Sequence, residues 1–111
     1  MSDKQYNVES IKGTVTIAAG TTVGTTTFEN INGVTKTIFF TTPNMEDTDS
    51  TNFQIVNSAG NAFMTSGTKA ESATHVLGTE VALVGTDKII VTAEGTQSAA
   101  KAITYDIRLI R

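Results

Sequence analysis

The sequence predicts an all-β protein, an antiparallel sandwich of two sheets with jelly-roll or Greek-key-like connections and about eight or nine short strands. Threonine, which favours strands over helices, occupies 21 of the 111 positions. Nine glycines, with scattered Asn and Ser, supply turns. From residue 74 onward the turn signals recur about every eight to twelve residues, which is typical of a sandwich. We expect one sandwich domain over residues 9–111 and an N-terminal arm over residues 1–8.

The first core strand is predicted over residues 11–17, where apolar or small residues alternate with Lys and Thr. Upstream, Tyr6 and Val8 fall on the opposite phase of the alternation. The change of phase at Glu9-Ser10 predicts a bulge or break that separates the arm from the core strand. We therefore expect the arm to contact a neighbouring molecule, with Tyr6 and Val8 as its interface residues.

A hairpin is predicted around Asn32-Gly33, because this dipeptide is the strongest short hairpin signal in the chain. Its strands would be residues 25–31 and 34–42. A type I′ turn at this place would set Glu29 opposite Lys36, an ion pair across the two strands.

A second hairpin is predicted between the strand that holds Phe53 and the segment 62–65, with residues 57–61 as its turn. Further strands are expected at 74–77, 80–84, 88–93 and 102–110. The alternation predicts a core of Val15, Ile17, Phe28, Ile38, Phe40, Phe53, Ile55, Phe63, Val76, Leu83, Ile90, Ile103, Tyr105, Ile107 and Leu109.

Composition and charge exclude several classes of function. The chain has no cysteine, which excludes disulfide frameworks, zinc knuckles and thiol nucleophiles. The net charge is -3, and the eight Lys and Arg residues are scattered, so we expect no nucleic-acid partner. No window approaches the ~20 apolar residues of a membrane helix, and the first residues lack the apolar core of a secretion signal, so we expect no membrane partner.

The acidic segment 46–52 is the densest cluster of oxygen ligands in the sequence. Asp47 and Asp49 have the alternate spacing with which a loop wraps calcium, but the glycine and the distal Glu of such a loop are missing. We expect a solvated loop in which Asp and Ser cap their own backbone, with a cation site at Asp47 and Asp49 as the alternative.

No catalytic constellation is evident, so we expect a protein that is not an enzyme and takes no cofactor. The single histidine, His75, lies inside a predicted strand without a nucleophile motif near it. The Thr-x-Thr segments have irregular spacing, which argues against an ice-binding array. The absence of Trp argues against a sugar-binding platform.

Several stretches of the chain together resemble a known family. They are Gly13–Gly20, then Ile38–Pro43 leading into Thr51–Val56 and the turn at Gly60, and finally Ile103–Leu109. Their order resembles that of small tailed-bacteriophage virion proteins of the head decoration, or cement, type.

This resemblance implies a compact β-sandwich that binds the major capsid protein on the outer surface of a phage head, as a homotrimer. It implies location in the virion after synthesis in the cytoplasm of the host bacterium, and contacts through the arm and edge strands. The alternatives are a carbohydrate- or receptor-binding module of a phage tail or fibre, and an unrelated cytoplasmic β-sandwich.

Overall fold

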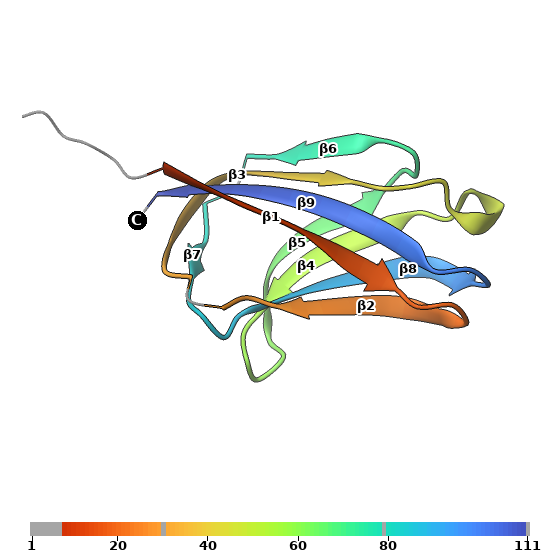
Figure 1. Cartoon of the computed structure of the whole chain (residues 1–111), viewed down its shortest axis with the longest axis horizontal. Helices are drawn as coiled ribbons and strands as arrows, with labels where there is room; N and C mark the ends of the chain where they lie inside the picture. Colours follow the sequence, from red (N-terminus) through yellow and green to blue (C-terminus); the bar gives the residue numbers. More distant parts are fainter. Residues whose placement is uncertain (1–7, 30, 79, 111) are drawn as a thin grey trace, which may run out of the picture.

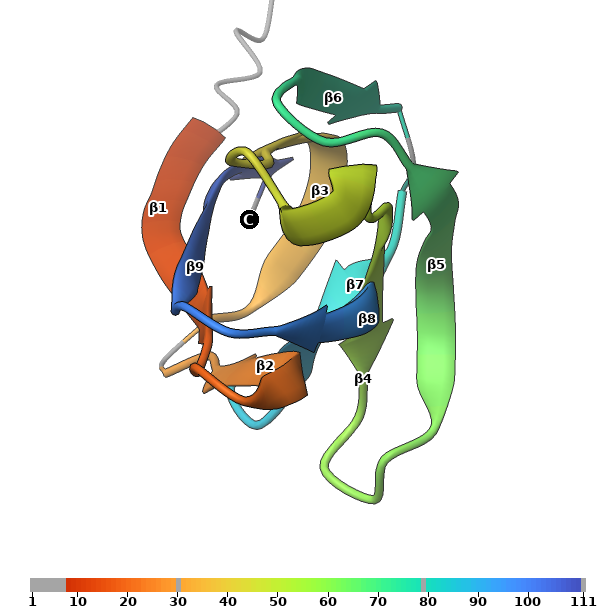
Figure 2. The same cartoon turned by 90° about the vertical axis from the view of Figure 1, so that its right-hand side faces the viewer.

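The chain folds into two antiparallel β-sheets packed face to face (Figures 1 and 2). A computed structural model describes residues 8–29, 31–78 and 80–110. Sheet A has the order β1-β9-β3-β6, with β7 also paired to β3, and sheet B has the order β2-β8-β4-β5. The strands are β1 (Val8–Ile17), β2 (Thr21–Thr27), β3 (Gly33–Thr41), β4 (Thr51–Val56), β5 (Ala62–Lys69), β6 (Thr74–Leu77), β7 (Ala82–Leu83), β8 (Lys88–Gln97) and β9 (Lys101–Ile110).

This strand order is that of a jelly roll. The first strand pairs with the last, β1 with β9, and β2 pairs with β8 in the other sheet. Such pairing results when a long antiparallel hairpin rolls up into two sheets. The only helical element among the described residues is the 3-10 turn η1 (Glu46–Thr48). The predicted all-β, jelly-roll class is confirmed.

The bulge predicted at Glu9-Ser10 was wrong. The β1–β9 ladder runs from Val8, opposite Ile110, to Ile17, opposite Lys101, without a shift of register. Val8 is therefore the first residue of β1, and its side chain lies on the outer face, as the strand's alternation requires. The rest of the expected arm, residues 1–7, lies outside the described residues.

The hairpin predicted at Asn32-Gly33 was also wrong. Strand β2 lies in sheet B and β3 in sheet A, so the chain crosses between the sheets here, and Phe28 and Ile31 are both buried on the way. Lys36 pairs with Glu80 rather than with Glu29. The burial of two large apolar side chains in the crossing outweighs a local turn signal.

The second predicted hairpin is confirmed, since β4 and β5 pair through a turn at residues 57–61. The side-chain oxygen of Asn57 accepts hydrogen bonds from the backbone N–H groups of Ala59 (3.0 Å) and Asn61 (2.9 Å). Gly60 has φ +90, a conformation that glycine adopts at little cost. This turn shows why local chemistry sufficed to predict the hairpin.

The core lies between the sheets and is centred on Phe40 of β3 and Phe53 of β4, whose rings stack at 4.8 Å between centroids. Most predicted core residues are buried. Three predictions were wrong: Phe63 and Val76 are exposed, and Ile90 faces outward while Ile89 is fully buried. Phe63 lies at a register shift of the β4–β5 ladder, which disturbs the alternation, and the expected phase of β8 was one residue out.

A candidate interaction surface on the outer face of sheet A

The outer face of sheet A is an ordered grid, because the antiparallel registers place outward side chains side by side across four strands. We name its rows by their composition. The apolar row is Val8, Ile110, Val34 and Ala82; the arginine row is Ser10, Arg108 and Thr37; the mixed row is Lys12, Asp106, Phe39 and Val76; the threonine row is Thr14, Thr104, Thr41 and Thr74.

The apolar row exposes aliphatic side chains from four different strands. Val8 is 63% exposed, Val34 is 40% exposed, Ala82 is also exposed and Ile110 is half-buried. Contiguous apolar surface of this kind is characteristic of sites that contact other molecules. Val8, a predicted interface residue, is thus brought together with three residues that sequence reasoning did not select.

The charged groups of this face are bound to one another. The Arg108 Nε donates to both carboxylate oxygens of Asp106 (3.1 and 3.2 Å), and Nη2 donates to Oδ2 (3.0 Å). These hydrogen bonds hold the pKa of Asp106 below its ordinary value, and the positive charges of Arg108 and Lys12 act in the same direction. The guanidinium carbon lies 5.6 Å from the centroid of the Phe39 ring, a cation–π contact.

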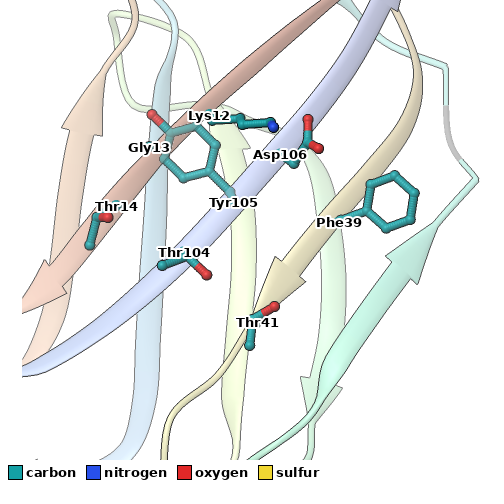
Figure 3. A pocket seen from close by; sticks show the side chains of 8 residues that line it. All are labelled: Lys12, Gly13, Thr14, Phe39, Thr41, Thr104, Tyr105 and Asp106. Carbon is teal, nitrogen blue, oxygen red and sulfur yellow. The ribbon is translucent and has the colours of Figure 1, made fainter.

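A shallow hollow of about 450 Å³ opens between β1, β9 and β3 on this sheet (Figure 3). Its lining combines one aromatic ring, three hydroxyl groups and a Lys–Asp pair. Within it, Tyr105 packs on Gly13, since a Cβ atom at Gly13 would lie 2.4 Å from the tyrosine hydroxyl. Partial burial raises the pKa of Tyr105. The lining residues are Lys12, Gly13, Thr14, Phe39, Thr41, Thr104, Tyr105 and Asp106.

The threonine row is more regular than the sequence suggested, because strand registry aligns residues that are far apart in the chain. The hydroxyls of Thr41 and Thr74 are 2.9 Å apart. The next row, however, holds Lys12, Asp106 and Phe39, so the grid contains one row of threonines rather than a two-dimensional array.

The acidic segment forms a structural loop that is held from the far side of the sandwich. The fully buried Gln97 donates from Nε2 to Asp49 Oδ2 (2.8 Å) and accepts from the backbone N–H of Glu46 (2.9 Å). Asp47 is exposed, with φ 52. Across the described ranges, no group of three or more His, Cys, Asp or Glu side chains could hold a metal ion. Neither Asp47 nor Asp49 caps its own loop as expected, since Asp49 binds a residue of β8.

Glu46 fastens the same loop to the β8–β9 turn. Its Oε2 accepts from the backbone N–H of Ser98 (2.9 Å), and its Oε1 accepts from the Ser98 hydroxyl. These hydrogen bonds, the one from the hydroxyl first, lower the pKa of Glu46 below its ordinary value.

His75 covers the edge of the core. Its ring centroid lies 5.0 Å from that of Phe40, and its Nε2 is 2.8 Å from the carbonyl oxygen of Ala70. Tyr6, the other predicted interface residue, lies outside the described residues. The signals that sequence reasoning missed, Val34, Phe39, Ala82 and Ile110, become neighbours only through the register of non-consecutive strands.

Comparisons with known proteins reach the fold. No protein-family model matches the chain, and no curated protein is similar to it in sequence. Among solved structures it is similar, with a TM-score of 0.54 and 15% identity over 99% of this chain and 94% of the other, to a chain from work titled "Bacillus endospore appendages form a novel family of disulfide-linked pili". The likeness supports the β-sandwich fold. In the part of the chain that the structure describes, no helix could cross a membrane.

Proposed function

We propose that this protein is a structural subunit of a multi-copy surface assembly, with no catalytic role. The observation that carries the proposal is the apolar row of sheet A, four exposed or half-exposed aliphatic side chains aligned across β1, β9, β3 and β7. Apolar residues with few charges among them mark the centres of protein–protein interfaces. The similar pilus chain supports the proposal by fold analogy.

The particular assembly that we propose is the outer surface of a phage head, where the protein binds the major capsid protein as a homotrimer. The order of strand and turn segments that resembles head-decoration proteins supports this choice. A second candidate is a subunit of an extracellular filament, which the similar pilus chain favours. Those pili are disulfide-linked, whereas this chain has no cysteine, so its own contacts would be non-covalent.

Sedimentation with capsid shells tests the proposal. Purified protein is mixed with stripped shells, and the bound fraction and the melting temperature of the shells are measured. We expect the protein to sediment with the shells and to raise their melting temperature, because a ligand that binds only the assembled state stabilises it. Light scattering of the protein in solution gives its oligomeric state, for which we expect a trimer.

Two matched substitutions locate the contact. Val34→Lys places a charge in the apolar row, and Val23→Lys places the same charge at a similarly exposed valine of β2 in sheet B. We expect the first to lower the bound fraction and the second to leave it unchanged. Unchanged binding of both variants would contradict the role of the apolar row, and filaments in electron micrographs without shell binding would favour the second candidate.

The hollow on sheet A favours the alternative of a carbohydrate-recognition module, since it combines Phe39 with hydroxyl and carboxylate groups. A glycan array probed with the native chain and with Phe39→Ala tests this role. Saturable binding of one glycan class that the substitution abolishes would support recognition over assembly.

A further inference from the structure

We propose that the outer face of sheet A binds a second copy of itself around a two-fold axis that runs through the arginine row. The inference names the contact between copies of the proposed structural subunit and rests on that function for its purpose. The contact itself follows from where the apolar side chains of this face lie.

Two apolar pairs occupy the same two columns of the grid. Val34 of β3 lies beside Ala82 of β7, and Phe39 of β3 lies beside Val76 of β6. Thr37 of β3 separates the pairs by one row on each side, because the register shift at residues 35–37 absorbs one residue. The two pairs are therefore equally spaced about Thr37.

This spacing is self-complementary. A two-fold axis along the arginine row turns each column of one copy onto the same column of the other and exchanges the apolar row with the mixed row. Val34 then faces Phe39 of the second copy, and Ala82 faces its Val76. Val76, which is 60% exposed in the isolated chain, gains an apolar partner in this way.

The charges of the face are compatible with such a contact. Asp106 and Arg108 already satisfy each other through three hydrogen bonds, so covering them leaves no unpaired charge. Lys12 lies at the β1 side of the sheet, away from the β3 column that carries both apolar pairs.

The size of the contact predicts its strength. Four strands about 4.8 Å apart and three rows about 6.7 Å apart cover roughly 400 Å² on each copy. Stable complexes bury about 800 Å² on each partner. We therefore expect the isolated pair to be weak and to be occupied when many copies are held together in an assembly. A two-fold contact of this kind is distinct from any three-fold contact within a trimer.

Thiol cross-linking of the isolated protein tests the geometry, since the chain has no cysteine of its own. Thr37→Cys lies on the proposed axis, and Val23→Cys is the control on sheet B. With a short bis-maleimide linker, we expect Thr37→Cys to form covalent dimers at least about tenfold faster than the control, because the contact raises the local thiol concentration. Equal rates would overturn the proposal.

Two further variants test the direction of the axis. Ala82→Cys mixed with Val76→Cys should form mixed dimers faster than either variant alone, since the axis brings residue 82 of one copy to residue 76 of the other. Dimers that form as fast from either variant alone would overturn this arrangement. Adding Val34→Lys to Thr37→Cys should reduce cross-linking to the control rate, with an unchanged circular dichroism spectrum showing that the fold is kept.

The result separates the contact from the proposed function. Cross-linking needs only the purified chain, whereas the function is tested by binding to shells. Specific cross-links without shell binding would support the self-contact and contradict the capsid role. Shell binding without specific cross-links would do the reverse.

Discussion

At the scale of single residues, buried hydroxyl groups show how one atom's partner decides the sign of a substitution. Thr51 of β4 is 1% exposed, and its hydroxyl has no hydrogen-bond partner among the described residues. Thr35 of β3 is fully buried too, but its hydroxyl accepts a hydrogen bond from the backbone N–H of Val81 (3.0 Å). The same change at the two positions should therefore have opposite effects.

We predict that Thr51→Val raises the free energy of unfolding by about 1 kcal/mol, because it removes a desolvated hydroxyl at nearly constant shape. Thr35→Val should lower it by about 1 to 3 kcal/mol, because it leaves the N–H of Val81 unsatisfied. Urea unfolding midpoints of the two variants measure both effects. A destabilised Thr51→Val would mean that its hydroxyl has a partner in solution.

Glu46 predicts an acid-sensitive contribution to stability. Its hydrogen bonds from Ser98 lower the pKa of the folded carboxyl below the ordinary 4.5. The stabilisation is therefore complete above the ordinary pKa and is lost as the pH falls through the lowered value. We expect Glu46→Gln to be less stable than the native chain at pH 7, with the difference shrinking toward pH 3. Urea midpoints at several pH values measure this, and a constant difference would contradict it.

At the scale of elements, Gly33 shows what the β2–β3 crossing requires. It is not among the glycines with positive φ, as a type I′ turn would need, but it lies against β9. A Cβ atom there would lie 2.7 Å from Leu109 Cδ1 and 2.8 Å from the Ile110 carbonyl oxygen. Glycine is needed at this position for close approach of two strands.

We predict that Gly33→Ala lowers the free energy of unfolding by about 1 to 3 kcal/mol, because backbone atoms of β9 would have to move. Gly78 provides the control, since nothing lies within 4 Å of a Cβ atom built there and its φ is not positive. Gly78→Ala should be neutral or stabilise by up to about 1 kcal/mol through the unfolded chain. Thermal midpoints compare the two, and equal shifts would contradict the close approach at Gly33.

At the scale of the whole molecule, the two sheets are joined at the centre of the core by the Phe40–Phe53 stack. Each ring comes from a different sheet and is fully buried. A single cooperative core of this kind should unfold as one unit.

We predict that Phe53→Ala lowers the free energy of unfolding by about 3 to 5 kcal/mol, because it leaves a cavity between the sheets. That is a large share of the ~5 to 15 kcal/mol typical of a domain. Phe63→Ala, the same change at an exposed ring of the adjacent strand, should cost less than about 1 kcal/mol. Similar losses in both variants, measured by urea unfolding, would show that Phe63 is buried in solution.

The sequence by itself determined the all-β class, the β4–β5 hairpin and most of the core, because each depends on local alternation or on a turn that its own residues complete. Asn57 and Gly60, for example, act within five residues. It also pointed to Val8 as a surface residue on the opposite phase from the core.

Only the tertiary structure decided which strands pair and therefore which surface side chains meet. The crossing at Asn32-Gly33 depends on burial of Phe28 and Ile31, which outweighs the local turn preference. The apolar row joins residues from both ends and the middle of the chain, and no local pattern encodes the register that aligns them. Side-chain direction alternates along each strand, but neighbours across a sheet are set by the whole fold.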